Sequence, residues 1–227
     1  MGRWSADRLA AASGIAFVVL FIAAFFSATK PPDSTDSNAQ WVTYFVDHHR
    51  ATLISAVLLG AAVIFFIWFA GSVGAALRNA GEARLGAVAF GGGVATAAVA
   101  IVIAGLQGAL AYRIAIDSPA SVKAFVDLAY GVQVVISFPV AVLIGATAIA
   151  SWRSDAFPQW WAGTSGVAAV VMVSGGGALA HSGFYRPDGA WSFVTLIVFL
   201  VWTLVTSGWL VMRTHAEAMP RTAAAAA

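Results

Sequence analysis

Histidine, aspartate, tyrosine and glutamine side chains collect beside the ends of long apolar segments, where they could bind a metal ion, a haem or a small polar molecule. Asp47, His48 and His49 precede one such segment, and Gln107 and Tyr112 close the next. The candidate ligand-binding residues are Asp47, His48, Gln107, Tyr112, Asp127, Tyr130, Gln133, His181 and Tyr185. If the segments bundle, these groups converge around a mostly apolar cavity, the usual form of a small-molecule site. The competing interpretation is that they are interfacial side chains facing water and lipid headgroups.

Metal chemistry at these positions has the right ligand types but not the right spacing. His48, His49 and His181 are the candidate metal ligands, with Asp47 or Asp127, and such groups suit zinc. No H-E-x-x-H spacing is present, and adjacent helical histidines point about 100° apart. A haem held between His181 and His48 or His49 also stays open. The chain has no cysteine, so thiolate sites are excluded. No cofactor is predicted, and metal or haem binding is the alternative.

The composition indicates a membrane protein. Of 227 residues, 60% are hydrophobic and only 10% are charged, whereas soluble domains have about 45–50% apolar and about 25% charged residues. Intrinsic disorder requires the opposite balance and is excluded. The net charge of +2 comes from scattered residues, so no basic patch for nucleic acid is expected.

Long uncharged runs predict an all-α, polytopic membrane protein: a bundle of six transmembrane helices in a single domain, residues 1–222. Each run exceeds the roughly 20 residues that a helix needs to cross the hydrocarbon core, and only helices or closed barrels satisfy their backbone in lipid. The first run is too long for a signal peptide and is expected to be retained. Residues 223–227 form a low-complexity tail. The predicted spans are 9–29, 51–77, 85–112, 128–152, 157–181 and 190–212.

Loop charges predict the orientation. Basic residues are slightly more frequent at the end that would carry both termini, which favours cytoplasmic N- and C-termini in a multi-pass plasma-membrane protein.

Two connections at the opposite, outer side have helical patterns of their own. Ser37 and Gln40 form a capping-box pattern, and Trp41, Tyr44 and Phe45 follow at helical spacing. A similar pattern begins after Pro119. We therefore expect short amphipathic helices on the outer face.

The interior of the spans offers small residues and no charge. The lack of a mid-span Asp, Glu, Lys or Arg argues against ion-coupled pumps and proton relays. Gly91–Gly93 and Gly175–Gly177 are explained first by close helix packing. The alternative for Gly175–Gly177 is an unwound stretch that exposes carbonyls. Pro139 lacks a backbone donor, frees the Val135 carbonyl and predicts a kink.

Several motifs resemble a known group of proteins. They are Pro31-Pro32-Asp33 through Tyr44-Phe45, Asp47-His48-His49-Arg50, Phe66-x-Trp68-Phe69 and Leu77-Arg78. The chain resembles uncharacterised six-span integral membrane proteins of high-GC actinobacteria. The resemblance implies six spans and a bacterial plasma membrane, and it supplies no catalytic residues.

The leading functional hypothesis is non-catalytic binding of a lipid or small amphiphile in an outward-facing pocket, by the protein alone or as a partner subunit. A small-solute transporter or channel is the first alternative. A membrane metallo-enzyme or haem redox protein using the outer histidines is the second. The expected partners are membrane lipids and, in a homo-oligomer or complex, a second copy or another membrane protein.

Overall fold

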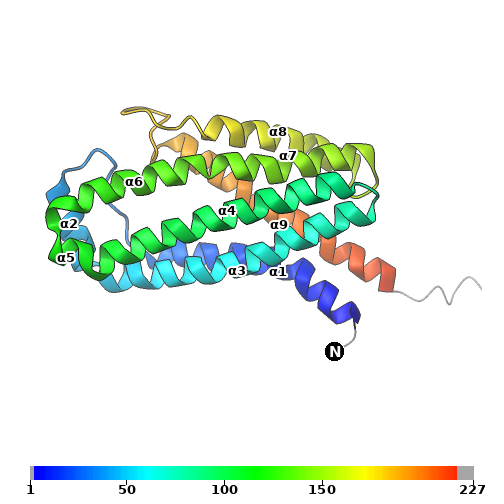
Figure 1. Ribbon diagram of the computed structural model, residues 1–227, viewed down its shortest axis with the longest axis horizontal. Coiled ribbons are helices and arrows are strands. Elements are labelled where there is room, and N and C mark those ends of the chain that lie inside the picture. Colours follow the sequence, from blue (N-terminus) through cyan, green and yellow to red (C-terminus); the bar gives the residue numbers. More distant parts are fainter. Residues whose placement is uncertain (1–2, 219–227) are drawn as a thin grey trace, which may run out of the picture.

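A computed structural model describes residues 3–218, with side chains from residue 9 to residue 213. This part of the chain is all-helical, which confirms the predicted all-α class, and it contains no strand (Figure 1). The tail 223–227 lies outside the described residues. The elements are α1 (Arg3–Ser27), α2 (Asn38–Asp47), α3 (His49–Asn79), α4 (Ala83–Ala109), a π-helical turn η1 (Leu110–Ile114), α5 (Ala115–Asp117), a 3-10 turn η2 (Pro119–Ser121), α6 (Val122–Val135), α7 (Ser137–Arg153), α8 (Gln159–Gly175) and α9 (Ala190–Ala218).

Five stretches are long and apolar enough to cross a membrane, and they coincide with five of the predicted spans. They are Leu9–Ser27, His49–Asn79, Ala83–Asp117, Pro119–Arg153 and Ala190–Arg213.

The sixth predicted span, 157–181, contains a shorter helix than expected. Helix α8 has 17 residues and ends at Gly175, the first of three glycines, although the uncharged run continues beyond it. At 1.5 Å per residue, α8 spans about 25 Å, somewhat less than the roughly 30 Å hydrocarbon core. Glycine has a low helix propensity, which explains why the helix stops there while the hydropathy does not.

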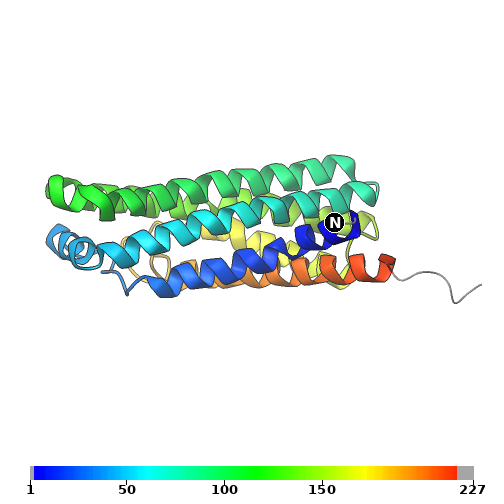
Figure 2. The ribbon, with the colours of Figure 1, turned by 90° about the horizontal axis from the view of Figure 1, so that it is seen from below.

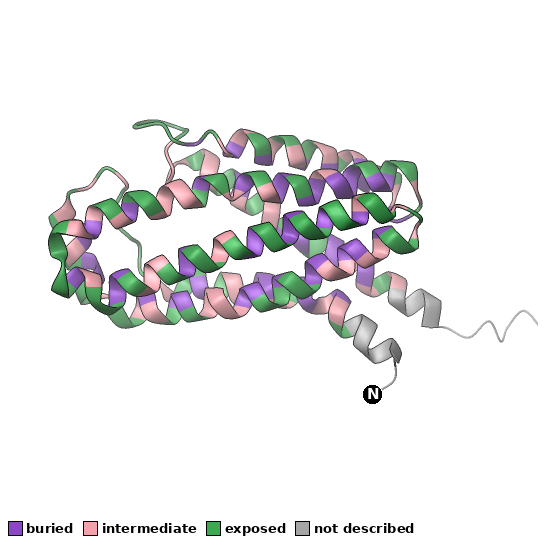
Figure 3. Ribbon diagram, in the orientation of Figure 1, coloured by how far each residue is buried: buried purple, intermediate pink, exposed green. Residues whose placement is uncertain are grey.

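The long helices form one elongated bundle. α1 packs on α3 and α9, α3 on α4, α4 on α7, and α7 on α8. Figure 2 shows α1 and α9 side by side, with the start of α1 and the end of α9 at the same end of the bundle. Buried residues face inward and exposed apolar residues face outward along most helices (Figure 3). The side chains at the centre of the core include Phe66, Phe69, Leu143, Ile144, Met172 and Trp202.

Glycine on α4 permits close contact with α7. A Cβ atom added to Gly92 would lie 2.7 Å from the backbone nitrogen of Leu143 and 2.9 Å from the carbonyl oxygen of Pro139. The neighbouring Gly91 has open space at the same position. Close helix packing therefore explains Gly92, as the sequence pattern indicated.

A second, smaller apolar core lies at the opposite end of the bundle from the start of α1. We call this the α2 end. Trp41, Tyr44 and Phe45 of α2 are buried against Leu110 and Val122, on η1 and α6. The capping box that predicted α2 is confirmed, since Ser37 Oγ accepts from the Gln40 N–H and the Gln40 side chain accepts from the Ser37 N–H. The apolar face of α2 therefore packs on protein.

The pattern after Pro119 does not form a separate short helix. It is the beginning of a long, nearly continuous element, η2–α6–α7, which is interrupted at Ile136. The interruption lies three residues before Pro139, where a kink was predicted. Pro119–Arg153 has 35 residues and would extend about 52 Å, well beyond a hydrocarbon core of about 30 Å. The surplus length carries the second core.

Candidate binding site at the α2 end

An open depression lies between α2 and the connection from α1. Its volume is about 610 Å³, within the range of small-molecule sites, and it is wide and shallow. Pro31 and Pro32 lie in this connection, and a turn follows in which the Asp36 N–H donates to the Asp33 carbonyl at 2.9 Å. The polar lining residues include Lys30, Asp33, Asp36, Gln40, Thr43, Tyr44, Asp47 and His48.

Tyr44 and His48 are held as a pair in this lining. The Tyr44 hydroxyl donates to the Thr29 carbonyl at 2.9 Å, which ties α2 to the chain leaving α1. The two rings stack with centroids 5.1 Å apart. The His48 Nδ1 lies 3.1 Å from the Tyr44 carbonyl oxygen, so Nδ1–H can donate there and leave Nε2 as an acceptor. His48 is the single residue between α2 and α3, and this fixes its position.

The depression has an acidic lining. Asp33, Asp36 and Asp47 outnumber Lys30, the one lysine there. The Asp36 carboxylate accepts from the Asp33 N–H, whereas the Asp47 carboxylate makes no hydrogen bond or ion pair within the described part of the chain. A ligand group with a positive charge is therefore favoured over an anion.

Hydrogen bonds and ion pairs join the connection 28–37 to the segment 176–189. Asp188 Oδ2 accepts from the Ser34 N–H at 2.7 Å, and Oδ1 accepts from the Ser34 hydroxyl at 2.9 Å. Arg186 donates to both Asp188 oxygens and lies 3.8 Å from Asp33. Burial opposes ionisation of Asp188, but the hydrogen bonds from Ser34 and Arg186 outweigh it and lower the pKa of this carboxyl.

A second set of contacts fixes the start of α2. The Asn38 side chain donates to the Pro119 carbonyl at 2.9 Å and accepts from the Lys123 N–H at 2.8 Å. The Lys123 ammonium reaches the Ser34 carbonyl and pairs with Asp127 at 2.7 Å. These contacts attach the start of α2 to the start of α6 and to the connection after α1.

The candidate residues from the sequence do not gather around one mouth. Of the nine, Asp47 and His48 line the depression, while Asp127 pairs with Lys123 outside its lining. Tyr130 packs on Trp41, with ring centroids 6.3 Å apart. The rest also lie outside the lining: Gln107 is half-buried on α4, Tyr112 is exposed on η1, Gln133 is exposed on α6, His181 is exposed after α8, and Tyr185 packs on Trp191.

The sequence did not indicate most of the residues whose contacts hold the segments around the depression together. Ser34, Asn38, Lys123 and Asp188 were not among the candidates, and they sit in loops or helix starts. The only local signal was the turn-forming Pro31-Pro32-Asp33 stretch, because the partners are far apart along the chain.

The histidines are not clustered with other metal-binding groups. No group of three or more His, Asp or Glu residues suited to a metal ion occurs among the residues that the structure describes. His48 is half-buried, whereas His49 and His181 are exposed. The His49 Nδ1 lies 3.3 Å from the Val46 carbonyl oxygen, a local contact across the junction of α2 and α3.

Comparisons with known proteins add no relative. No protein-family model matches the chain, and neither a curated protein nor a solved structure matches it. The resemblance to actinobacterial membrane proteins therefore stays an expectation from the sequence motifs.

Proposed function

We propose that the protein is a six-span plasma-membrane protein that binds a small amphiphile with a positively charged head at its outer end. In this proposal both termini are cytoplasmic and the α2 end faces outward. The depression beside α2 takes the head group. The observation that supports the proposal is the depression itself: its lining is acidic and its volume of about 610 Å³ suits a small head group. The exposed aromatic side chains Phe25 and Phe26 precede it on α1.

The position of α8 supports an even number of crossings. α8 packs along α7 and starts near the same end as the last turn of α7 (Figure 1). The 176–189 segment returns the chain to α9, and its backbone groups bond within the segment, for example from the Ala180 N–H to the Tyr185 carbonyl at 3.1 Å. Such internal bonding suits a segment near the membrane boundary, where unpaired backbone groups are costly.

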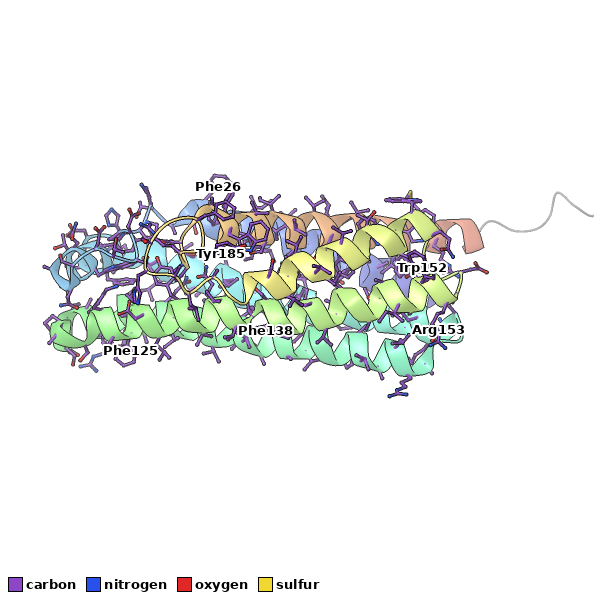
Figure 4. The ribbon with its side chains drawn as sticks, turned by 90° about the horizontal axis from the view of Figure 1, so that it is seen from above. Phe26, Phe125, Phe138, Trp152, Arg153 and Tyr185 are labelled. Carbon is purple, nitrogen blue, oxygen red and sulfur yellow. The ribbon has the colours of Figure 1, made fainter. Side chains whose placement is uncertain are left out.

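The end of α1 offers a place for an apolar tail. Phe25 and Phe26 are 53% and 77% exposed, and Phe26 points away from the bundle in Figure 4. Lys30, the first residue of the depression's lining, follows within a few residues. An amphiphile could thus place its head between Asp36 and Asp47 and its tail along α1 in the lipid.

Charge discrimination tests the proposal. The full chain in nanodiscs is titrated with an alkyltrimethylammonium and with an alkyl sulfate of equal chain length, and bound ligand is counted by native mass spectrometry. We expect the cationic amphiphile to bind at one saturable site, and Asp47→Asn to weaken it about tenfold, a loss of about 1.4 kcal/mol. The control is Asp117→Asn, an exposed carboxylate paired with Arg113 outside the lining. Equal binding of the two amphiphiles, or no effect of Asp47→Asn, contradicts the proposal.

Small-solute transport is the second candidate. It is favoured by the interruption at Ile136 and the early end of α8 at Gly175, because transporters often place binding sites at discontinuous helices. Uptake of a small solute into lipid vesicles that contain the purified chain tests this second candidate.

A further inference from the structure

Two measured contacts set the alignment of α8 with α9. The Trp202 indole N–H donates to the Ser165 hydroxyl at 2.9 Å. Near the end of α9, Arg213 Nη1 donates to the carbonyl of Ala156, just before α8, at 2.8 Å. A step forward along α9 from Trp202 therefore corresponds to a step back along α8 from Ser165. The two helices run antiparallel, and the start of α8 lies beside the later turns of α9 (Figure 4).

Trp161 on α8 and Thr206 and Trp209 on α9 lie between these two contacts. Trp161 is one turn before Ser165, whereas Thr206 and Trp209 follow Trp202 by four and seven residues. Such spacings keep side chains on one face of a helix, so all three lie on the faces by which α8 and α9 meet. Trp161 belongs to the main apolar core, and Trp209 packs against that core. The antiparallel alignment therefore places Thr206 opposite Trp161, with Trp209 one turn further along.

Each of these three side chains has a buried polar atom without a partner. Trp161 Nε1, Thr206 Oγ1 and Trp209 Nε1 make no hydrogen bond to any described residue. Trp161 is 5% exposed and Thr206 is 0% exposed. The Ser165 hydroxyl accepts from Trp202, but it donates to none of the described residues. Four hydrogen-bond donors therefore lack an acceptor in one part of the core, and this costs free energy unless something else binds them.

We propose that these donors bind a halide anion such as chloride. An indole N–H can only donate, so a ligand shared by two indoles must be an acceptor. The start of α8 adds a positive partial charge, and no side chain caps it at Pro158. The guanidinium of Arg213 adds a full positive charge at the same end. Asp155, the carboxylate nearest in sequence to the start of α8, is exposed, so water and salt screen its charge.

The proposed site lies far from the depression. The later turns of α9 are at the end of the bundle where α1 starts, opposite the α2 end (Figure 2). None of the four donor residues lines the depression. A bound anion would join the start of α8 to α9 and stabilise their contact. The inference is therefore independent of amphiphile binding.

Thermal unfolding of the full chain in detergent tests the site, with sodium chloride replaced stepwise by sodium gluconate at constant ionic strength. A ligand that binds only the folded state raises the melting temperature in a saturable way. We expect chloride and bromide to do so and gluconate not. Trp161→Phe keeps the aromatic ring and removes the N–H, and Thr206→Val keeps the shape and removes the hydroxyl. Each variant should raise the chloride concentration at half-maximal shift at least tenfold.

Trp191→Phe and Thr52→Val are the matched controls, because each removes a buried, unpartnered donor of the same type elsewhere in the chain. Both should keep the chloride shift of the wild type. Circular dichroism shows whether each variant folds, and either site variant alone decides the test. The proposal is overturned if chloride does not stabilise the wild type relative to gluconate. A chloride shift that is unchanged in the folded Trp161→Phe or Thr206→Val variant, or lost equally in the controls, also overturns it.

Discussion

Ser34 and Asp188 are 154 residues apart in the sequence and are joined by two hydrogen bonds, of 2.7 and 2.9 Å. This contact links the connection after α1 to the segment before α9. Both oxygens of Asp188 also accept from Arg186. One carboxylate therefore organises two loops that form the α2 end.

Replacing this carboxylate should loosen the loops. Asp188→Asn removes the negative charge that Arg186 faces and one of the acceptors for Ser34. We expect the free energy of unfolding to fall by about 1.5–3 kcal/mol, the usual range for hydrogen bonds to a charged group. Hydrogen exchange should become faster in residues 28–37 and 176–189. The control Asp117→Asn, which removes an exposed pair, should change exchange little.

The same contact should make the loops sensitive to acid. The folded-state pKa of Asp188 is lowered, so its contribution to stability is present above the unfolded pKa of about 3.9. The contribution is lost as the pH falls through the lower, folded-state pKa. The melting temperature of the wild type should therefore exceed that of Asp188→Asn at pH 7, and the difference should shrink below pH 4. A difference that grows on acidification contradicts this linkage.

Two adjacent glycines on α4 should respond differently to alanine. A Cβ on Gly92 meets the backbone of α7, whereas one on Gly91 meets nothing within 4 Å. Gly92→Ala should destabilise the bundle by about 1–3 kcal/mol, the usual cost of overpacking. Gly91→Ala should be neutral or slightly stabilising because alanine favours helix. Thermal unfolding in the same detergent compares them, and equal melting temperatures would exclude the close contact of α4 with α7.

The chain has no cysteine, so single cysteines can report its topology. Ser182→Cys, in the exposed segment after α8, should react with a membrane-impermeant maleimide on intact cells. Asn79→Cys and Asp155→Cys, at the other end, should react only after permeabilisation. Reaction of Ser182→Cys and Asp155→Cys from the same side would mean that α8 does not cross.

The sequence predicted those features that depend on local pattern or on composition. Long uncharged runs indicated the apolar helices, and the spacing of Ser37 and Gln40 indicated the start of α2. The end of α8 at Gly175 was expected only in the alternative interpretation, an unwound stretch at Gly175–Gly177, because residues after Gly175 remain apolar and hydropathy does not register helix propensity. The closeness of Gly176 to the Phe138 ring could not be predicted either, because it depends on how α8 packs on α7.

The candidate site was predicted less well than the fold. The sequence placed Asp47 and His48 next to an apolar segment, and both line the depression. It could not pair Ser34 with Asp188, because neither residue has a distinctive neighbour and the contact depends on how two loops meet. Gln133 and His181 were grouped with Asp47 and His48 because they were expected at a similar depth in the membrane. Depth does not give the direction of a side chain.

Cysteine protection in the depression tests the central claim most directly. Thr43 is exposed and lines the depression, so Thr43→Cys should react with an impermeant maleimide on intact cells. An alkyltrimethylammonium should slow this reaction at least tenfold, an alkyl sulfate should not, and Ser182→Cys should react equally with or without either amphiphile. Reaction of Thr43→Cys only after permeabilisation, or equal protection by both amphiphiles, would contradict an outward-facing site for a cationic amphiphile.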